Sequence, residues 1–192
     1  MKNLAVGVVL TTKIGTTRLG ERSLLDQAMA KFKEVRGIHS VQVAQAEDAV
    51  LPAGLTGFPW QPPSGPPACA WTDYLQQQLG RDFAYIVMTA AHTPLVTAGR
   101  LELLLSLVKT KARRAFLVLP MRATLHQAKD KPICEYASPL IVGSLALRTP
   151  LAPEKPNLIE TMATEAEWAE GLDARDPLQL DHITRLRTRQ IF

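Results

Sequence analysis

The sequence predicts an α/β fold, a three-layer α/β/α sandwich around a mostly parallel, Rossmann-like sheet. Valine-rich apolar runs recur along the chain, and segments with helical spacing of apolar residues separate them. The chain has 192 residues, of which 46% are hydrophobic and 21% charged. This length and composition predict a single domain with a sizeable core over residues 1–192.

The first elements form a β-α-β unit. Residues 4–10 (LAVGVVL) are a continuous apolar run, as expected for a central parallel strand covered on both faces. After a polar loop, a helix ending near Gly37 is expected from the spacing of Leu24, Leu25, Ala28, Met29 and Phe32. Residues 41–44 (VQVA) predict a second, short strand.

Residues 51–67 are rich in proline and glycine, so no regular element is expected there. The segment is either a surface loop over a site or a disordered excursion. A helix is expected next, from about residue 72 to residue 80.

Further strands are predicted at residues 83–88 (FAYIVM) and 115–119 (AFLVL), with an apolar helix over residues 101–109 between them. That helix packs either within the fold or across a homodimer, and the sequence leaves both open. Residues 140–147 are a candidate strand, and the C-terminal region near residues 168 and 183–186 reads as helical.

The overall charge is +4, with a pI of about 9.2. Cations gather at residues 109–114 and 185–189, either as solvated helical faces or as a positive field suited to a phosphorylated small molecule. Aromatic residues are only 6% and no nucleic-acid motif is present, so no nucleic-acid partner is expected.

Other classes of protein are also disfavoured. The two cysteines form no CxxC pair, so neither a disulfide framework nor a zinc site is predicted. The apolar run at residues 4–10 is too short for a signal peptide, and no segment approaches the roughly 20 apolar residues of a membrane span. We therefore expect no membrane partner and a cytoplasmic location.

Ligands of such sheets bind beyond the carboxyl ends of the strands, so the loops after Leu10, Met88 and Leu119 are the candidate site. The first, residues 12–24 (TKIGTTRLGERSL), offers two glycines for tight turns and several hydroxyls. Its cations are Lys13, Arg18 and Arg22. Such a loop can present N–H groups and positive charge to phosphates, or it can be a solvated basic loop.

The order of these residues resembles the signature loop of the cytidylyltransferases that activate sugar acids such as 3-deoxy-manno-octulosonate and sialic acid. Their pattern, Ala-Arg-x-x-Ser-Thr-Arg-Leu-Pro-Gly-Lys-x-Leu, aligns without a gap with residues 12–24. The family's first Arg becomes Lys13, its Ser becomes Thr16 and its Lys becomes Arg22. Gly20-Glu21 replaces Pro-Gly, which puts a carboxylate beside the proposed phosphate site.

The resemblance implies the nucleotide-diphospho-sugar transferase fold, CTP as the nucleotide and a sugar-acid-like acceptor. It implies that Lys13 and Arg22 are the catalytic cations that hold the triphosphate. Thr12, Thr16 and Arg18 would lie in the same nucleotide-binding site.

Two weaker similarities to the family follow in the same order along the chain. Trp71-Thr72-Asp73 resembles its Gly-Thr-Asp before a helix, which implies that Thr72 and Asp73 lie near the base or ribose. The alternative is that Thr72 or Asp73 caps that helix. His92 stands where the family's Gly-Asp-x-Pro-Leu has its metal-binding Asp. It could touch a phosphate as an imidazolium or be a polar surface residue.

Residues 172–177 (LDARDP) resemble the family's late acidic segment, so Asp173 and Asp176 are both candidate ligands of Mg²⁺. Because Mg²⁺ accepts nitrogen ligands poorly, His92 weakens that site. Two functions remain open. One is a CTP-dependent nucleotidyltransferase acting on a sugar acid or related metabolite. The other is a degenerate relative that keeps nucleotide binding as a regulatory or partner subunit.

Overall fold

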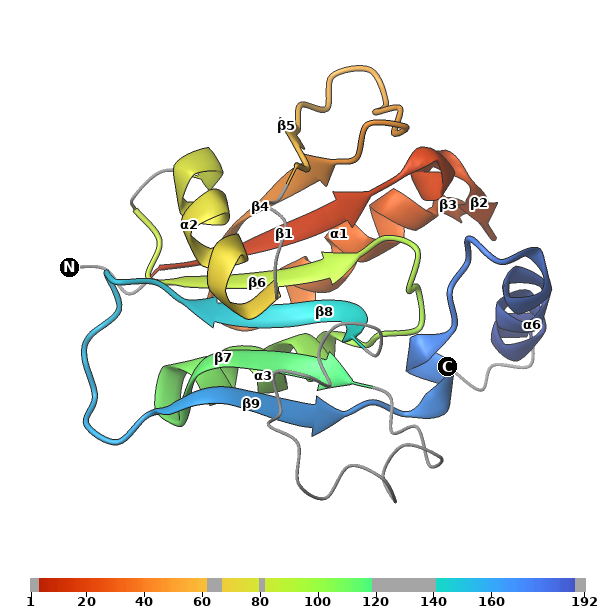
Figure 1. Cartoon of the computed structure of the whole chain (residues 1–192). Helices are drawn as coiled ribbons and strands as arrows, with labels where there is room; N and C mark the ends of the chain where they lie inside the picture. The colour runs from red at the N-terminus through yellow and green to blue at the C-terminus, as the bar shows by residue number, and fades with distance from the viewer. Residues whose placement is uncertain (1–3, 62–66, 80–81, 119–140, 189–192) are drawn as a thin grey trace.

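The computed structural model describes residues 4–61, 67–79, 82–118 and 141–188. Its centre is a seven-stranded sheet (Figure 1). In spatial order the strands are β5 (Phe58–Pro59), β4 (Ile38–Gln45), β1 (Ala5–Thr11), β6 (Tyr85–Ala90), β8 (Ile141–Arg148), β7 (Ala112–Val118) and β9 (Ile159–Glu165). β8 runs antiparallel to both β6 and β7, whereas the other neighbouring strands are parallel. The predicted mostly parallel sheet is confirmed.

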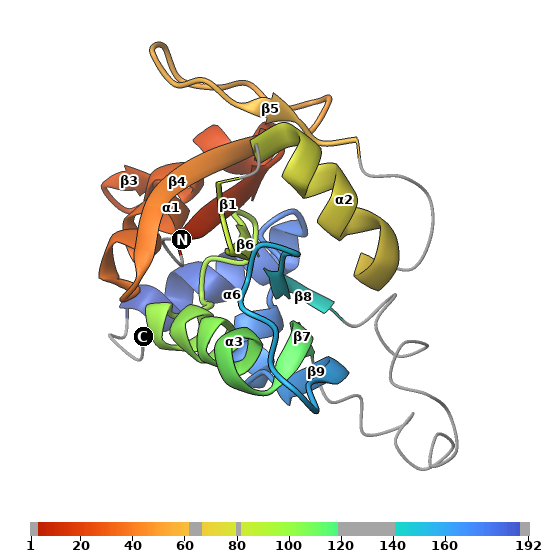
Figure 2. The ribbon, with the colours of Figure 1, turned by 90° about the vertical axis from the view of Figure 1, so that its left-hand side faces the viewer.

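Helices cover both faces of this sheet. α1 (Leu24–Glu34) and α3 (Ala98–Thr110) lie against one face and α2 (Pro67–Leu79) against the other (Figure 2). A fourth helix, α6 (Pro177–Thr188), lies beyond the edge at which the parallel strands end (Figure 1). The arrangement is the predicted three-layer α/β/α sandwich.

The central strand β1 is buried on both faces, as its sequence predicts. Val9 belongs to the core cluster under α1 and α3, and Val6 and Val8 belong to the one under α2. A Cβ added at Gly7 would lie 2.7 Å from the ring of Phe32. Glycine at this position therefore allows α1 to pack directly on the strand.

The two helices on the α1 face are close to the predicted ranges. Ser23 caps α1, because its Oγ accepts from the N–H of Asp26 at 3.1 Å. In α3, Leu101, Leu104 and Leu105 are buried within the fold. This helix therefore packs within the chain itself, and the homodimer stays a prediction.

Two expectations were wrong, and one strand was missed. The helix expected from residue 72 begins at Pro67, a residue type that the first turn of a helix tolerates. Thr72 and Asp73 therefore lie inside α2 and do not cap it. The proline-rich segment contributes the two-residue strand β5, which pairs with Ala44 and Gln45. The exposed strand β9 was not predicted.

Some predictions fall outside the described residues. These are the loop after Leu119, the interior of the proline-rich segment at residues 62–66 and the side chain of Thr72. Within the described ranges, no helix combines the length and hydrophobicity that crossing a membrane requires. The cytoplasmic location stays a prediction.

Candidate functional site

Three segments meet at the carboxyl edge of the parallel strands (Figure 1). They are the loop after β1, the loop after β6 and the segment that leads into α6. Backbone hydrogen bonds connect the first two, since the N–H of Ala91 donates to the carbonyl of Leu10 at 2.8 Å. The N–H of Ala46 donates to the carbonyl of Thr11 at 2.9 Å, which brings the loop after β4 to the same edge.

The basic loop after β1 has a defined backbone. It begins with a short 3₁₀ helix, Lys13–Thr16, and continues into a hairpin formed by β2 (Arg18–Leu19) and β3 (Arg22–Ser23). Gly20, at the first position of the hairpin turn, has φ 76°, a conformation that favours glycine. Gly15 is also required, because a Cβ there would collide with Oγ1 of Thr11.

The three cations of this loop are exposed: Lys13, Arg18 and Arg22. Among the described residues, none of their side chains forms an ion pair. Cross-strand pairs share a face of a hairpin, so the pairing of Leu19 with Arg22 places these two side chains together. Both line a cavity beside α1 and α6. Arg18, which pairs with Ser23, lies on the other face.

The hydroxyls of the loop differ in exposure. Thr16 is exposed, whereas Thr12 is half-buried. The Oγ1 atom of Thr12 is fully covered and has no hydrogen-bond partner within the described part of the chain. A covered hydroxyl without a partner is a candidate contact for a bound group.

His92, in the loop after β6, is buried, with 7% of its surface exposed. Burial, and next the charge of Arg175, lower its pKa to about 4. Its Nδ1 is covered and lacks a hydrogen-bond partner among the described residues. The side chain is therefore not a surface residue, and at neutral pH the imidazole carries no charge.

Asp173 lies close to His92 but is held by another residue. Nε of Arg175 lies 3.0 Å and 2.9 Å from its two carboxylate oxygens. Burial raises the pKa of Asp173, but the hydrogen bonds from Arg175 outweigh this effect and the net pKa is lowered. The same pairing raises the pKa of Arg175. The pair is ionised at neutral pH.

Asp176 immediately precedes α6, and within the described part of the chain its carboxylate has other partners than that of Asp173. Its two oxygens accept from the N–H of Leu178 at 2.9 Å and from Nε2 of Gln179 at 3.0 Å. These bonds cap α6. Asp176 is therefore placed as a structural residue at the start of the helix.

This arrangement does not fit Mg²⁺ coordination. Magnesium prefers oxygen ligands, and the oxygens of Asp173 and Asp176 already accept hydrogen bonds from neighbouring residues. Within the described ranges, no group of three or more His, Cys, Asp or Glu side chains is placed to hold a metal ion. The cation that accompanies Asp173 is the guanidinium of Arg175.

Asp73 lies elsewhere. It lines a cavity with Arg113 and Arg148, from the start of β7 and the end of β8. These residues belong to the opposite edge of the sheet from the basic loop. The structure therefore brings Thr12, Lys13, Thr16, Arg18 and His92 to one edge and leaves Asp73 at the other.

Two residues at this edge were missed by the sequence analysis. Arg175 lies only two residues after Asp173, and this spacing could have indicated that the two side chains form an ion pair. Lys31, on α1, donates from Nζ to the carbonyl oxygen of Pro94 at 2.6 Å. Burial and the charge of Arg187 lower its pKa to about 7. A helical lysine carries no sequence signal of such a contact.

The chain was compared with known proteins. No protein-family model matches it, and no curated sequence gives a significant match. Among solved structures, CMP:2-keto-3-deoxy-manno-octonic acid synthetase complexed with CTP superposes with a TM-score of 0.64 at 14% identity. The match covers 97% of this chain and 99% of that one.

Two further solved structures match over similar lengths. The 4-diphosphocytidyl-2C-methyl-D-erythritol synthase of Anaerococcus prevotii has a TM-score of 0.63 at 9% identity, covering 96% of this chain and 98% of that one. The 2-C-methyl-D-erythritol 4-phosphate cytidylyltransferase of Thermus thermophilus has a TM-score of 0.60 at 16% identity, covering 95% and 98%. The likeness confirms the predicted fold.

Proposed function

We propose, from a fold shared with cytidylyltransferases, that this chain binds a nucleoside triphosphate at the carboxyl edge of its sheet, with CTP as the expected nucleotide. One observation carries the proposal. Lys13, Arg18 and Arg22 extend from the loop directly after β1, exposed and without ion pairs among the described residues. Uncompensated cations on a fixed backbone suit the charge of a triphosphate.

The individual roles follow from position. Lys13 and Arg18 would contact phosphate oxygens, and the hydroxyls of Thr12 and Thr16 would donate to them. Arg22 would reach the same phosphates only around the hairpin, since Leu19 and Arg22 share the face opposite to Arg18. Substitution of Arg22 therefore shows whether the phosphates contact both faces of the hairpin or only the face that carries Arg18.

The reaction we propose is cytidylyl transfer to a sugar acid or related metabolite. An oxygen of the acceptor attacks the α-phosphorus of CTP, the bond to the β-phosphate oxygen breaks, and pyrophosphate leaves. The contribution of the chain is to hold the reacting groups in line and to offset the charge of the phosphoryl oxygens. Lys13 and Arg22 are the residues proposed to supply that charge.

A second function is favoured by the environment of His92. The imidazole is neutral and buried, and the carboxylate of Asp173 is bound to Arg175. Such a site can hold an anionic ligand, while the carboxylates of Asp173 and Asp176, the two candidate ligands of a divalent ion, already accept hydrogen bonds from neighbouring residues. Nucleotide binding without transfer, in a regulatory or partner subunit, is therefore the alternative.

One pair of measurements separates the two functions. CTP binding is measured by calorimetry with and without Mg²⁺, and pyrophosphate release is then assayed against a panel of sugar acids. Because Arg175 already neutralises Asp173, we expect CTP to bind without Mg²⁺. Binding with release supports transfer, whereas binding without release for every acceptor supports the alternative. If neither CTP nor another nucleoside triphosphate binds, both proposals are wrong.

A further inference from the structure

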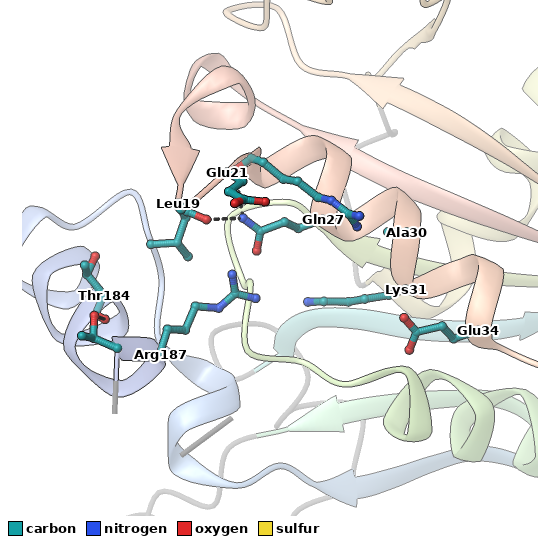
Figure 3. Close-up of a pocket in the computed structure, with 11 residues that line it drawn as sticks. Leu19, Glu21, Gln27, Ala30, Lys31, Glu34, Thr184 and Arg187 are labelled. Carbon is teal, nitrogen blue, oxygen red and sulfur yellow. Dashed lines mark hydrogen bonds between the residues drawn. The ribbon is translucent and has the colours of Figure 1, made fainter. Parts of the chain in front are cut away.

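A cavity of about 690 Å³ lies between the β2–β3 hairpin, α1 and α6. It is on the face of the hairpin that carries Leu19 and Arg22, whereas Arg18 is on the other face. Figure 3 shows that its side chains come from three separate elements. The cavity is therefore a feature of the tertiary fold and not of the basic loop alone.

Two cations meet in this cavity. The ammonium of Lys31 on α1 and the guanidinium of Arg187 on α6 point toward each other (Figure 3). Among the described residues, neither forms an ion pair with a carboxylate. Burial and the charge of Arg187 lower the pKa of Lys31 to about 7, against a smaller opposite effect of the charges of Glu34 and Glu170, and burial lowers the pKa of Arg187. An anion between them would offset both burial and mutual repulsion.

The ammonium group of Lys31 has N–H donors that are not used within the protein. One of its three N–H groups is used by the carbonyl of Pro94 at 2.6 Å, which also fixes the side chain in place. The other two remain for a ligand. Glu21 and Glu34 also line the cavity, but neither lies within ion-pair distance of the two cations. They limit the negative charge that the cavity can accept.

Gln27 adds an acceptor to the same cavity. Its Nε2 donates to the carbonyls of Leu19 at 2.8 Å and Arg22 at 3.0 Å, so the amide orientation is fixed. Gln27 is only 8% exposed, and its Oε1 is fully covered. This oxygen has no hydrogen-bond partner within the described residues. A ligand that satisfies it must present a hydrogen on oxygen or nitrogen, as a hydroxyl group does.

We propose that this cavity binds a small phosphate-bearing metabolite through Lys31 and Arg187, which the nucleotide proposal does not use; among the described residues, Arg22 is the one that borders both sites. Lys31 and Arg187 hold the phosphate oxygens, and Oε1 of Gln27 accepts from a hydroxyl of the ligand. The proposal goes beyond the nucleotide-binding function and does not depend on it. It requires only the two facing cations and the orientation of one amide.

The test uses inorganic phosphate as the probe and the full chain. Calorimetry should show saturable binding that Arg187→Gln and Lys31→Met each weaken about tenfold or more, the scale expected for a lost charge-assisted contact. Arg185→Gln is the matched control. Arg185 lies on the same helix but pairs with Asp181 at 2.7 Å, and it does not line the cavity. The affinity of the Arg185→Gln variant for phosphate should equal that of the unmodified chain.

Thermal melting of each variant shows whether the fold is kept, and Arg187→Lys, which retains a cation, should recover part of the affinity. Repeating the titration at saturating CTP distinguishes the two possible phosphate sites. Unchanged phosphate affinity supports a separate site, and loss of phosphate binding to CTP overturns it. Absence of saturable binding below ~10 mM, or equal losses in Arg187→Gln and Arg185→Gln, also overturns the proposal.

Discussion

The N–H of Ala174 donates to the carbonyl oxygen of His92 at 2.8 Å. This single backbone bond joins the segment before α6 to the loop after β6. It also explains why Asp173 and Arg175, the residues on either side of Ala174, lie close enough to affect the pKa of His92. The candidate site is therefore built from both halves of the chain.

The stability of the fold should fall on mild acidification because of His92. Its pKa is about 4 in the folded chain against 6.5 for an ordinary histidine. Between these values the unfolded chain binds a proton that the folded chain does not, so stability is present above pH 6.5 and is lost as the pH falls toward 4. We expect a loss of about 3 kcal/mol, measured by urea denaturation.

His92→Gln should remove most of this pH dependence. His39→Gln is the control, since His39 is exposed on β4. If His92→Gln keeps the full slope between pH 4 and 6.5, the imidazole is not the group that titrates.

The Asp173–Arg175 pair should contribute to stability in a different pH range. The lowered pKa of Asp173 means that its contribution is present above the ordinary carboxyl pKa and is lost as the pH falls through the lower, folded value. Asp173→Asn should reduce the free energy of unfolding at pH 7 by about 0.5–1.5 kcal/mol, because the pair is partly exposed. The difference should shrink below about pH 4.

Asp181→Asn serves for comparison, since Asp181 forms an exposed ion pair with Arg185. It should cost only ~0–0.5 kcal/mol. Equal effects of the two variants would show that Asp173 gains nothing from its closer contacts.

Substitutions in the basic loop test how the triphosphate is held. Arg18→Ala and Arg22→Ala should each weaken CTP binding by ~1–3 kcal/mol if both guanidiniums contact phosphate. Arg36→Ala is the control, because Arg36 is exposed after the far end of α1. If Arg18→Ala weakens binding and Arg22→Ala does not, only one face of the hairpin serves the nucleotide.

The contact between β1 and α1 gives a stability prediction that is independent of function. Gly7→Ala places a Cβ 2.7 Å from the ring of Phe32, so we expect a loss of ~1–3 kcal/mol from overpacking. At Gly99, in the first turn of α3, the nearest atom to an added Cβ is 3.9 Å away. Gly99→Ala should be neutral or stabilise by up to ~1 kcal/mol. Denaturation midpoints of the two variants check both statements.

The sequence was sufficient for the strands that are buried on both faces. β1 and β6 appear as apolar runs because nearly all of their side chains are buried; Leu10 alone is half-buried. β9 was missed because it lies at the border of the sheet and exposes Ile159, Glu160, Ala163 and Glu165, which leaves no apolar run. The direction of β8 could not be predicted, because a buried strand has the same composition in either orientation.

The candidate site was predicted only in part. Local order along residues 12–24 was enough to indicate the basic loop. The burial of His92 and its bond to Ala174 depend on contacts between distant parts of the chain, which no local pattern carries. The facing cations Lys31 and Arg187 were missed for the same reason, since each alone reads as an ordinary residue of a helix.

The late, antiparallel strand β8 has a consequence for synthesis on the ribosome. It pairs with β6 on one side and β7 on the other, although both precede it in the chain. Until Ile141–Arg148 has emerged from the exit tunnel, β6 and β7 each have an edge with unpaired backbone groups. A nascent chain that stalls before this point should be prone to aggregation and a substrate for chaperones.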